Sequence, residues 1–149
     1  MERQVVLREV KDTFGIVPEF LRKAPDPHLS PLWESMRDLQ LKPGKIPPMY
    51  QQLIMLGVST YAKCKYCTDF HTEAAKALGA TDAEITETAL LTGHTANFSN
   101  YLGGTQYDFE QFKKEVRAAC QALIAQGAGA TAGGSAAGAR PPPPHQRMP

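Results

Sequence analysis

The stretch of residues 60–78 constrains this chain most, because it places two cysteines and a histidine at helical spacing. It reads TYAKCKYCTDFHTEAAKAL. Each residue of an α-helix advances by about 100°, so a helix here would bring Cys64, Cys67 and His71 onto an arc of roughly 60°. The charged residues of the stretch fall on the other side. The stretch therefore predicts a sheltered, apolar helix face that carries two thiols and an imidazole.

This spacing has a chemical meaning. Cysteines three residues apart on a helix can approach closely enough to form a disulfide. His71 lies one turn beyond Cys67 and can take a thiol proton, which matters because the thiolate is the nucleophile and a free cysteine has a pKa of about 8.5. A helix that begins close to Cys64 would lower the thiol pKa further through its unpaired amides. The pattern indicates thiol–disulfide chemistry, in which one cysteine attacks and the other resolves the adduct.

Three other interpretations of the motif stay open. Its side chains could simply pack in a core, and His71 alone could be a hydrogen-bonded core histidine. The motif could also bind zinc with His94 or Cys120 as fourth ligand, although the sequence has no second cluster of Cys and His. Cys120 is otherwise a small buried residue of a later helix, and His94 a helix-end or surface residue. The shared arc favours the redox interpretation.

Composition and charge narrow the class of protein. The chain has 149 residues, of which 42% are hydrophobic and 21% charged, with a net charge of +1. These values are ordinary for one soluble domain and give no electrostatic basis for binding nucleic acid or an anionic membrane. No apolar run approaches the roughly 20 residues of a membrane span, and the N-terminus lacks the apolar stretch of a secretory signal. The odd, low count of three cysteines argues against a disulfide framework, so we expect a cytoplasmic protein.

The rest of the chain predicts an all-α fold. The proline-dense ranges 17–31 and 42–48 are predicted connections, because proline cannot donate the helical hydrogen bond. Between them, helical spacing joins Leu32, Trp33, Met36 and Leu39. The range 48–58 predicts an apolar helix that buries Leu53, Ile54, Leu56 and Val58.

Local signals mark the later helices. Gly79 is a C-terminal stop, and the residues from Thr81 to Glu84 match a capping box that opens a helix to about Leu91. The range 107–126 predicts a last helix, with an inner face of Phe112, Val116, Ala119, Cys120 and Leu123.

The C-terminal stretch changes character. Residues 127–139 are only Gly, Ala, Thr and Ser, and four prolines follow Arg140. Such a segment cannot bury enough apolar surface to offset its ordering entropy. We expect one helical domain over residues 1–126 and a disordered tail over residues 127–149.

The motifs together resemble the alkyl hydroperoxidase D-like branch of the carboxymuconolactone decarboxylase superfamily, over about residues 12–125. The matching motifs are Phe14-Gly15-x-Val17-Pro18 with Leu21, Leu53-Ile54-x-Leu56, Cys64-x-Tyr66-Cys67-x-x-x-His71, and Ala75-x-x-Leu78-Gly79-Ala80-Thr81-x-x-Glu84-Ile85. The resemblance implies a helical bundle that forms homo-oligomers, as trimers or hexamers, with no organic cofactor and no metal.

The resemblance also implies a reaction. Cys67 would attack a hydroperoxide, Cys64 would resolve the adduct, and His71 would belong to a proton relay. An external thiol donor, such as a lipoyl-bearing or thioredoxin-like protein, would then reduce the disulfide. The alternatives are a non-catalytic redox sensor or disulfide-exchange partner and, less favoured because that branch generally lacks the cysteine pair, a decarboxylase.

Position 52 departs from the family pattern. Members of this type carry a glutamate twelve residues before the first cysteine, where this chain has Gln52. Glutamine can hydrogen-bond to His71 but cannot accept a proton or stabilise an imidazolium by its charge. Either the relay is weaker or another carboxylate replaces the glutamate, although Asp69 and Glu73 fall away from the sulfur face. A milder departure is Tyr66, where some members have a histidine.

Overall fold

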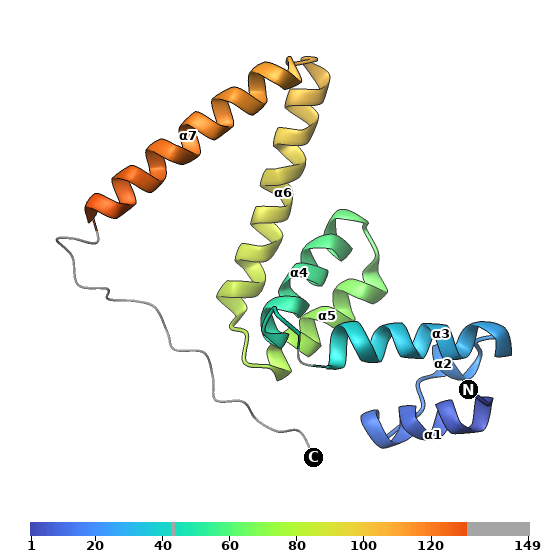
Figure 1. Cartoon of the computed structure of the whole chain (residues 1–149). Coiled ribbons are helices and arrows are strands. Elements are labelled where there is room, and N and C mark those ends of the chain that lie inside the picture. The colour runs from blue at the N-terminus through green and yellow to red at the C-terminus, as the bar shows by residue number, and fades with distance from the viewer. Residues whose placement is uncertain (43, 131–149) are drawn as a thin grey trace. The chain divides into compact units, whose positions relative to one another are not determined.

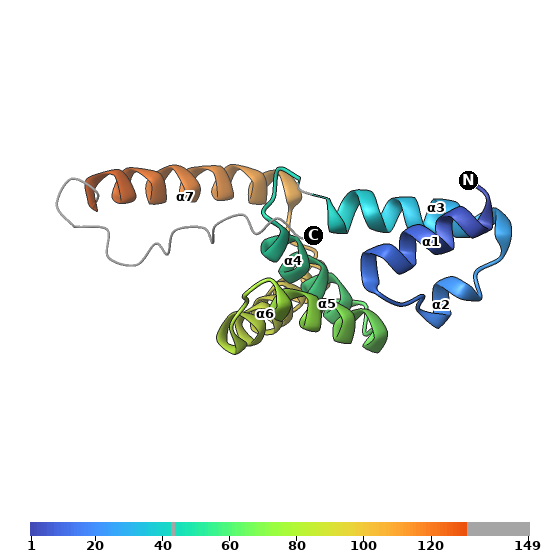
Figure 2. The ribbon, with the colours of Figure 1, turned by 90° about the horizontal axis from the view of Figure 1, so that it is seen from below.

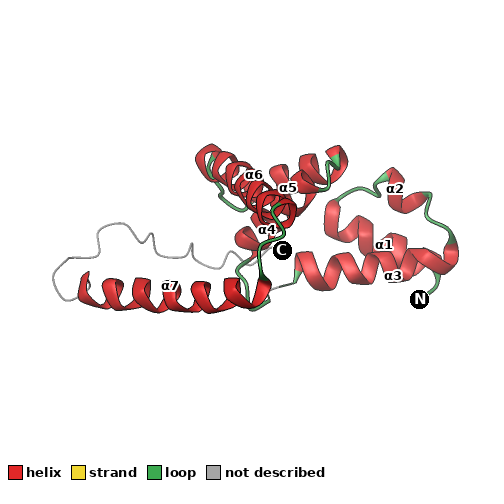
Figure 3. Ribbon diagram, turned by 90° about the horizontal axis from the view of Figure 1, so that it is seen from above, coloured by secondary structure: helices red, strands yellow, loops and turns green. Residues whose placement is uncertain are grey.

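The regular structure is helical throughout the described part of the chain (Figure 3). The computed structural model describes residues 1–42 and 44–130, with side chains described as far as residue 127. It contains no strand in those ranges, which confirms the all-α prediction. The elements are α1 (Arg3–Phe14), α2 (Glu19–Arg22), α3 (Asp26–Met36), the π-helix η1 (Arg37–Leu41), α4 (Pro48–Tyr61), α5 (Lys65–Ala77), α6 (Asp82–Gly104) and α7 (Phe109–Ala130) (Figure 1).

The chain divides into two compact units, residues 1–100 and the residues from Tyr101 onward. The expectation of one domain over residues 1–126 therefore stays a prediction. The last helix, α7, continues to Ala130, past the predicted start of the tail at residue 127. The rest of the predicted tail, residues 131–149, lies outside the described residues.

The core of the first unit is built by its three N-terminal helices. Figures 1 and 2 show α1 alongside α3 with α2 beside them. Trp33 is fully buried, and the Phe14 ring meets it edge-on at 5.8 Å between centroids. Full burial of such a side chain stabilises a fold by about 1.5–3 kcal/mol. The other buried members of this core are Val6, Val10, Leu21, Ala24 and Leu29.

One predicted connection is wrong. Helix α2 lies within the proline-dense range 17–31, and α3 begins inside it at Asp26 and continues to Met36. Pro18 and Pro25 are the N-caps of these helices and Pro27 lies in the first turn of α3, where no backbone donor is required. Pro31 is exposed inside α3, where it cannot donate a helical hydrogen bond. The predicted connection at 42–48 is confirmed, because η1 ends at Leu41 and α4 begins at Pro48.

Helices α4 and α5 pack against each other, but α4 buries a different face from the predicted one. Of the four predicted residues only Leu56 is buried, while Leu53 is half-buried and Ile54 and Val58 are exposed. The buried face instead follows positions 52, 56 and 59, which recur at helical spacing. Gln52 and Ser59 are therefore buried, whereas hydrophobicity alone predicted that Leu53, Ile54 and Val58 would be buried.

The start of α6 is as predicted and its end is not. Gly79 has a φ of 96°, in the left-handed region that favours glycine. Glu84 N–H donates to Thr81 Oγ1 at 3.2 Å, and Thr81 N–H donates to Glu84 Oε2 at 2.7 Å, which confirms the capping box. The helix continues past Leu91 to Gly104, because Gly93 costs only about 1 kcal/mol inside a helix and no proline follows it.

The predicted inner face of the last helix is not buried within the described part of the chain. Phe112 is half-buried, whereas Val116, Ala119, Cys120 and Leu123 are exposed. The expectation that Cys120 is buried is therefore wrong for the single chain. Across the described ranges, no helix combines the length and the apolar character that a membrane span requires.

Candidate active site

Cys64 lies at the boundary of a helix rather than inside it. It is the N-cap of α5, with extended backbone angles of φ −88° and ψ 97°, and α5 begins at Lys65. The preceding Lys63 has a left-handed φ of 55°, and the Cys64 N–H donates to Ser59 O at 3.0 Å. The helical angle predicted for Cys64 is thus wrong. Its sulfur nevertheless turns toward the helix and accepts the N–H of Cys67 at 3.4 Å.

The two sulfurs of the motif lie together. The Cys64 and Cys67 Sγ atoms are 2.9 Å apart, and both residues are free thiols. Cys64 is half-buried and Cys67 is exposed. The predicted shelter of the thiols is therefore not supplied by the single chain, while their predicted proximity is observed. At this distance only a small movement separates the dithiol from a disulfide.

The contact between the two sulfurs shifts the pKa values of the two thiols in opposite directions. The contact with the Cys67 sulfur and the hydrogen bond from the Cys67 N–H lower the pKa of Cys64 below its ordinary value. The contact with Cys64 raises the pKa of Cys67, because a thiolate on Cys67 would lie against the neighbouring sulfur. The first proton to leave the pair therefore leaves a thiolate on Cys64, stabilised at the start of α5.

His71 is buried on α5, one helical turn beyond Cys67. Its side chain is 8% exposed, and its Nδ1 lies 2.8 Å from Gln52 Oε1 on α4. Burial lowers the pKa of His71, because the imidazolium form would lose its hydration. Burial therefore favours the neutral imidazole over the imidazolium, and a neutral imidazole has one ring nitrogen free to accept a proton. The four predicted site residues form two contacting pairs, Cys64 with Cys67 and Gln52 with His71.

Gln52 has a second partner that the sequence did not indicate. Its Nε2 donates to the backbone carbonyl oxygen of Gln40 at 3.4 Å. Gln40 belongs to η1, where the Lys42 N–H donates to Arg37 O, five residues back, at 3.0 Å. One extra residue in such a turn redirects the carbonyls, and π-turns often occur at functional sites. A main-chain oxygen leaves no sequence signal, so only the fold could reveal this contact.

The remaining candidates lie apart from these contacts. Asp69 and Glu73 are exposed, and neither contacts His71 or the sulfurs in any hydrogen bond or ion pair described for this region. His94 is exposed on α6, with its ring 4.8 Å from that of Phe98. Within the described ranges, no three His, Cys, Asp or Glu side chains gather in a way that could hold a metal ion. Neither His94 nor Cys120 therefore completes a metal site there.

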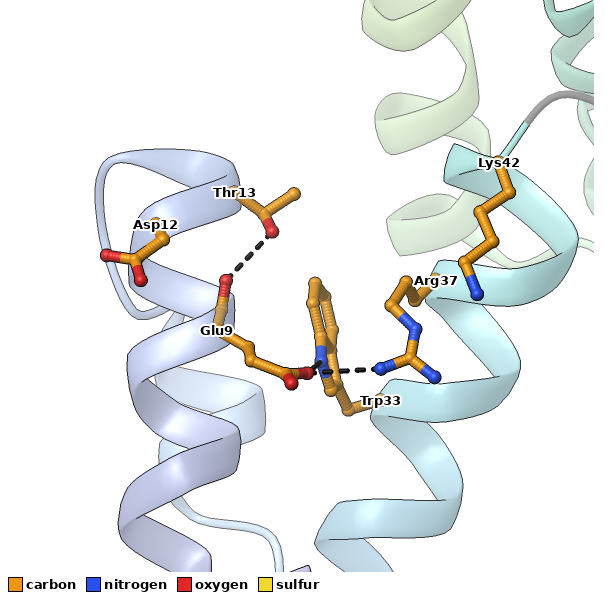
Figure 4. A pocket seen from close by; sticks show the side chains of 6 residues that line it. All are labelled: Glu9, Asp12, Thr13, Trp33, Arg37 and Lys42. Carbon is orange, nitrogen blue, oxygen red and sulfur yellow. Dashed lines mark hydrogen bonds and ion pairs between the residues drawn. The ribbon is translucent and has the colours of Figure 1, made fainter. Parts of the chain in front are cut away.

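The pocket drawn in Figure 4 lies between α1 and the end of α3. Its volume is about 440 Å³, and Glu9 accepts hydrogen bonds from Trp33 Nε1 at 2.9 Å and from Arg37 Nη1 at 3.1 Å. The other residues that line it are Asp12, Thr13 and Lys42. Through these two contacts Glu9 ties α1 to α3 and η1, and neither cysteine of the motif lines the pocket.

The described chain is all-α, with a cysteine pair at the start of α5 and a buried histidine on the same helix. These features define a class of dithiol protein. The chain belongs to the carboxymuconolactone decarboxylase family, whose model matches residues 27–101. It is also similar to the alkylhydroperoxidase AhpD core of Rhodospirillum rubrum ATCC 11170, a solved structure, with 30% sequence identity and a TM-score of 0.66. That match covers 74% of this chain and 85% of the other. No curated protein matches the chain.

These comparisons confirm the resemblance. The chain is an AhpD-like member of the carboxymuconolactone decarboxylase superfamily.

Proposed function

We propose that this protein reduces hydroperoxides with its Cys64–Cys67 pair and is then reduced by an external dithiol. The observation that carries the proposal is the contact of the two free sulfurs at 2.9 Å, in a chain similar to an alkylhydroperoxidase core. The family also bears the name of a decarboxylase. A pair of thiols in contact has an evident use in redox chemistry and none in the removal of a carboxylate.

The exposure of the two cysteines suggests their roles. Cys67 is exposed and can meet a peroxide, whereas Cys64 is half-buried and can resolve the product. The Cys67 thiolate would attack the outer oxygen of ROOH, so that an S–O bond forms, the O–O bond breaks and the alkoxide leaves as ROH after taking a proton. The Cys64 thiolate would then attack the sulfenic sulfur, forming the disulfide and releasing hydroxide, which leaves as water.

His71 would serve proton transfer in this cycle. The contact with Cys64 raises the pKa of Cys67, so attack by Cys67 requires a base that removes its proton. His71 lies one helical turn further along α5 and is held neutral by burial. A neutral imidazole accepts the thiol proton and returns it to the leaving alkoxide.

The partners belong to the same proposal. A reducing dithiol, supplied by a lipoyl-bearing or thioredoxin-like protein in the cytoplasm, would restore both thiols through exchange at the exposed Cys67. A homo-oligomer would cover the apolar side chains of the last helix, which the single chain leaves exposed.

The test is hydroperoxide consumption in the presence of a dithiol reductant. Wild type should turn over, with two thiols lost per chain when reductant is withheld. Cys67→Ser should be inactive, and Cys64→Ser should consume about one peroxide per chain when reductant is withheld, without forming a disulfide within the motif. Cys120→Ser is the matched control, because this third cysteine is exposed and outside the motif, and it should keep full activity. Unchanged consumption by Cys67→Ser would refute the proposal.

The second candidate is disulfide exchange or redox sensing without peroxidase turnover. The exposure of Cys67 favours it, because an exposed sulfur can also meet a protein disulfide. Loss of two thiols in a single event, with no further consumption in the presence of reductant, would identify this function instead.

A further inference from the structure

The buried amide of Gln52 connects a main-chain carbonyl to the imidazole of the candidate site. Gln52 is 2% exposed and belongs to α4, while its two partners belong to η1 and α5. Its Nε2 lies 3.4 Å from Gln40 O and its Oε1 lies 2.8 Å from His71 Nδ1. One amide thus bridges three segments of the first unit.

The chemistry of these atoms fixes the orientation of the amide. A backbone carbonyl only accepts hydrogen bonds, so the NH₂ group of Gln52 has to face Gln40 O. The opposite orientation would place two oxygens against each other in a buried position, where an unsatisfied acceptor is costly. The carbonyl oxygen of the amide is consequently directed at His71.

The orientation of the amide in turn fixes the proton on the imidazole. Gln52 Oε1 can only accept, so His71 Nδ1 has to donate and carries the ring hydrogen. In a neutral imidazole the other nitrogen, Nε2, then holds a free lone pair. Histidine tautomers are commonly set in this way by the group that accepts from the second nitrogen.

We propose that the Gln40 carbonyl in η1 orients the Gln52 amide so that His71 carries its proton on Nδ1 and presents an unprotonated Nε2 as the base. Gln52 is then a positioning residue, which acts through His71 and does not touch substrate. The inference deepens the proposed function and rests on it for the use of that base. This role requires an amide at position 52, because an ionised carboxylate there has no hydrogen to donate to Gln40 O.

The direct test is the ¹⁵N spectrum of the imidazole rings at alkaline pH, with the His71 signals assigned by their absence in His71→Gln. Wild type should show a protonated Nδ1 and an unprotonated Nε2 at His71. A protonated Nε2 would overturn the inference, and this measurement requires no variant of Gln52.

Two glutamine variants separate positioning from general packing. Gln52→Leu should lose the fixed Nδ1–H tautomer and lower the rate of peroxide turnover by about tenfold or more, the loss expected when a general base is mispositioned. Gln51→Leu is the matched control on the same helix. The Gln51 Oε1 is buried with no hydrogen-bond partner in the described part of the chain, so its removal should leave both tautomer and turnover unchanged. A fixed Nδ1–H tautomer in Gln52→Leu would overturn the role of the amide.

The two readouts keep the proposals distinguishable. A fixed Nδ1–H tautomer in a protein without turnover would support the positioning and refute the peroxidase. Turnover in a protein whose His71 carries its proton on Nε2 would support the peroxidase and refute the positioning.

Discussion

The N-terminal core and the last helix use apolar residues in opposite ways. In the core of α1, α2 and α3, Trp33 is fully buried with five further residues around it. In α7, none of the side chains described up to Gly127 is buried, and Leu123 is 65% exposed. Both regions carry apolar residues at helical spacing, so the pattern that predicts a helix does not say what covers its apolar face.

The difference indicates which part of the chain is stabilised by its own residues. The N-terminal helices find their partners within the first unit, because a short connection returns each helix to its neighbour. The apolar stripe of α7, at Phe112, Val116 and Leu123, is left for another surface. Stripes of this kind mark interaction sites in soluble proteins. We therefore expect the core to respond to mutation by unfolding and α7 to respond by dissociation.

The largest effect should come from truncating the centre of the core. Trp33→Ala removes a fully buried ring and its hydrogen bond to Glu9, and should lower the free energy of unfolding by about 3–5 kcal/mol. Denaturant titration followed by circular dichroism measures it. Leu32→Ala changes an exposed neighbour on the same helix and should cost under about 0.5 kcal/mol. Equal losses of unfolding free energy for the two variants would mean that the burial of Trp33 does not stabilise the core.

The next effect concerns the exposed stripe. Leu123→Glu should reduce the native mass to that of one chain if a second copy covers α7, because each buried leucine contributes about 1.5–3 kcal/mol to such a contact. Sedimentation or native mass spectrometry over a range of concentrations measures this. Gln121→Glu introduces the same charge at a polar position of the same helix and should leave the mass unchanged. A monomeric wild type would show that α7 does not contact a second copy of this chain.

A smaller effect tests the start of α6, where local sequence alone defines the structure. Thr81→Ala removes the side-chain oxygen that accepts the Glu84 N–H, and should cost about 1 kcal/mol. Thr86→Ala, one turn into the same helix, removes only a hydrogen bond to Asp82 O within the helix and should cost less. Thermal unfolding at constant pH compares the two variants. A greater loss at Thr86 would mean that the cap does not determine where the helix begins.

The sequence predicts the features that depend on residues close together in the chain, and not those that depend on contacts between separate helices. The capping box at Thr81 and the stop at Gly79 involve neighbours in the chain, so their residue types were sufficient. The motif with its two cysteines is equally local, and its sulfurs do meet. The burial of Gln52 in place of Ile54 was missed, because it depends on the carbonyl of Gln40 and on His71, from separate helices. The helix through Pro31 is not predicted, because it is stabilised by the packing of Leu29 and Trp33 in a core shared with other helices, which outweighs the cost of the proline.

The smallest effect is a dependence of stability on pH that belongs to the buried region and not to α7. Burial lowers the pKa of His71 below its value of about 6.5 in an unfolded chain, so at intermediate pH the unfolded state binds the additional proton. The stability that His71 contributes is therefore complete above pH about 6.5 and declines as the pH falls through that value toward the lower folded pKa. Thermal unfolding of wild type and His71→Gln across this range should show the slope in wild type only. Gln52→Glu should reduce the slope, because a carboxylate beside the ring favours the imidazolium and raises the pKa of His71. A wild-type slope that persists in His71→Gln would place the titrating group elsewhere, and the neutral base on which the candidate site depends would lose its support.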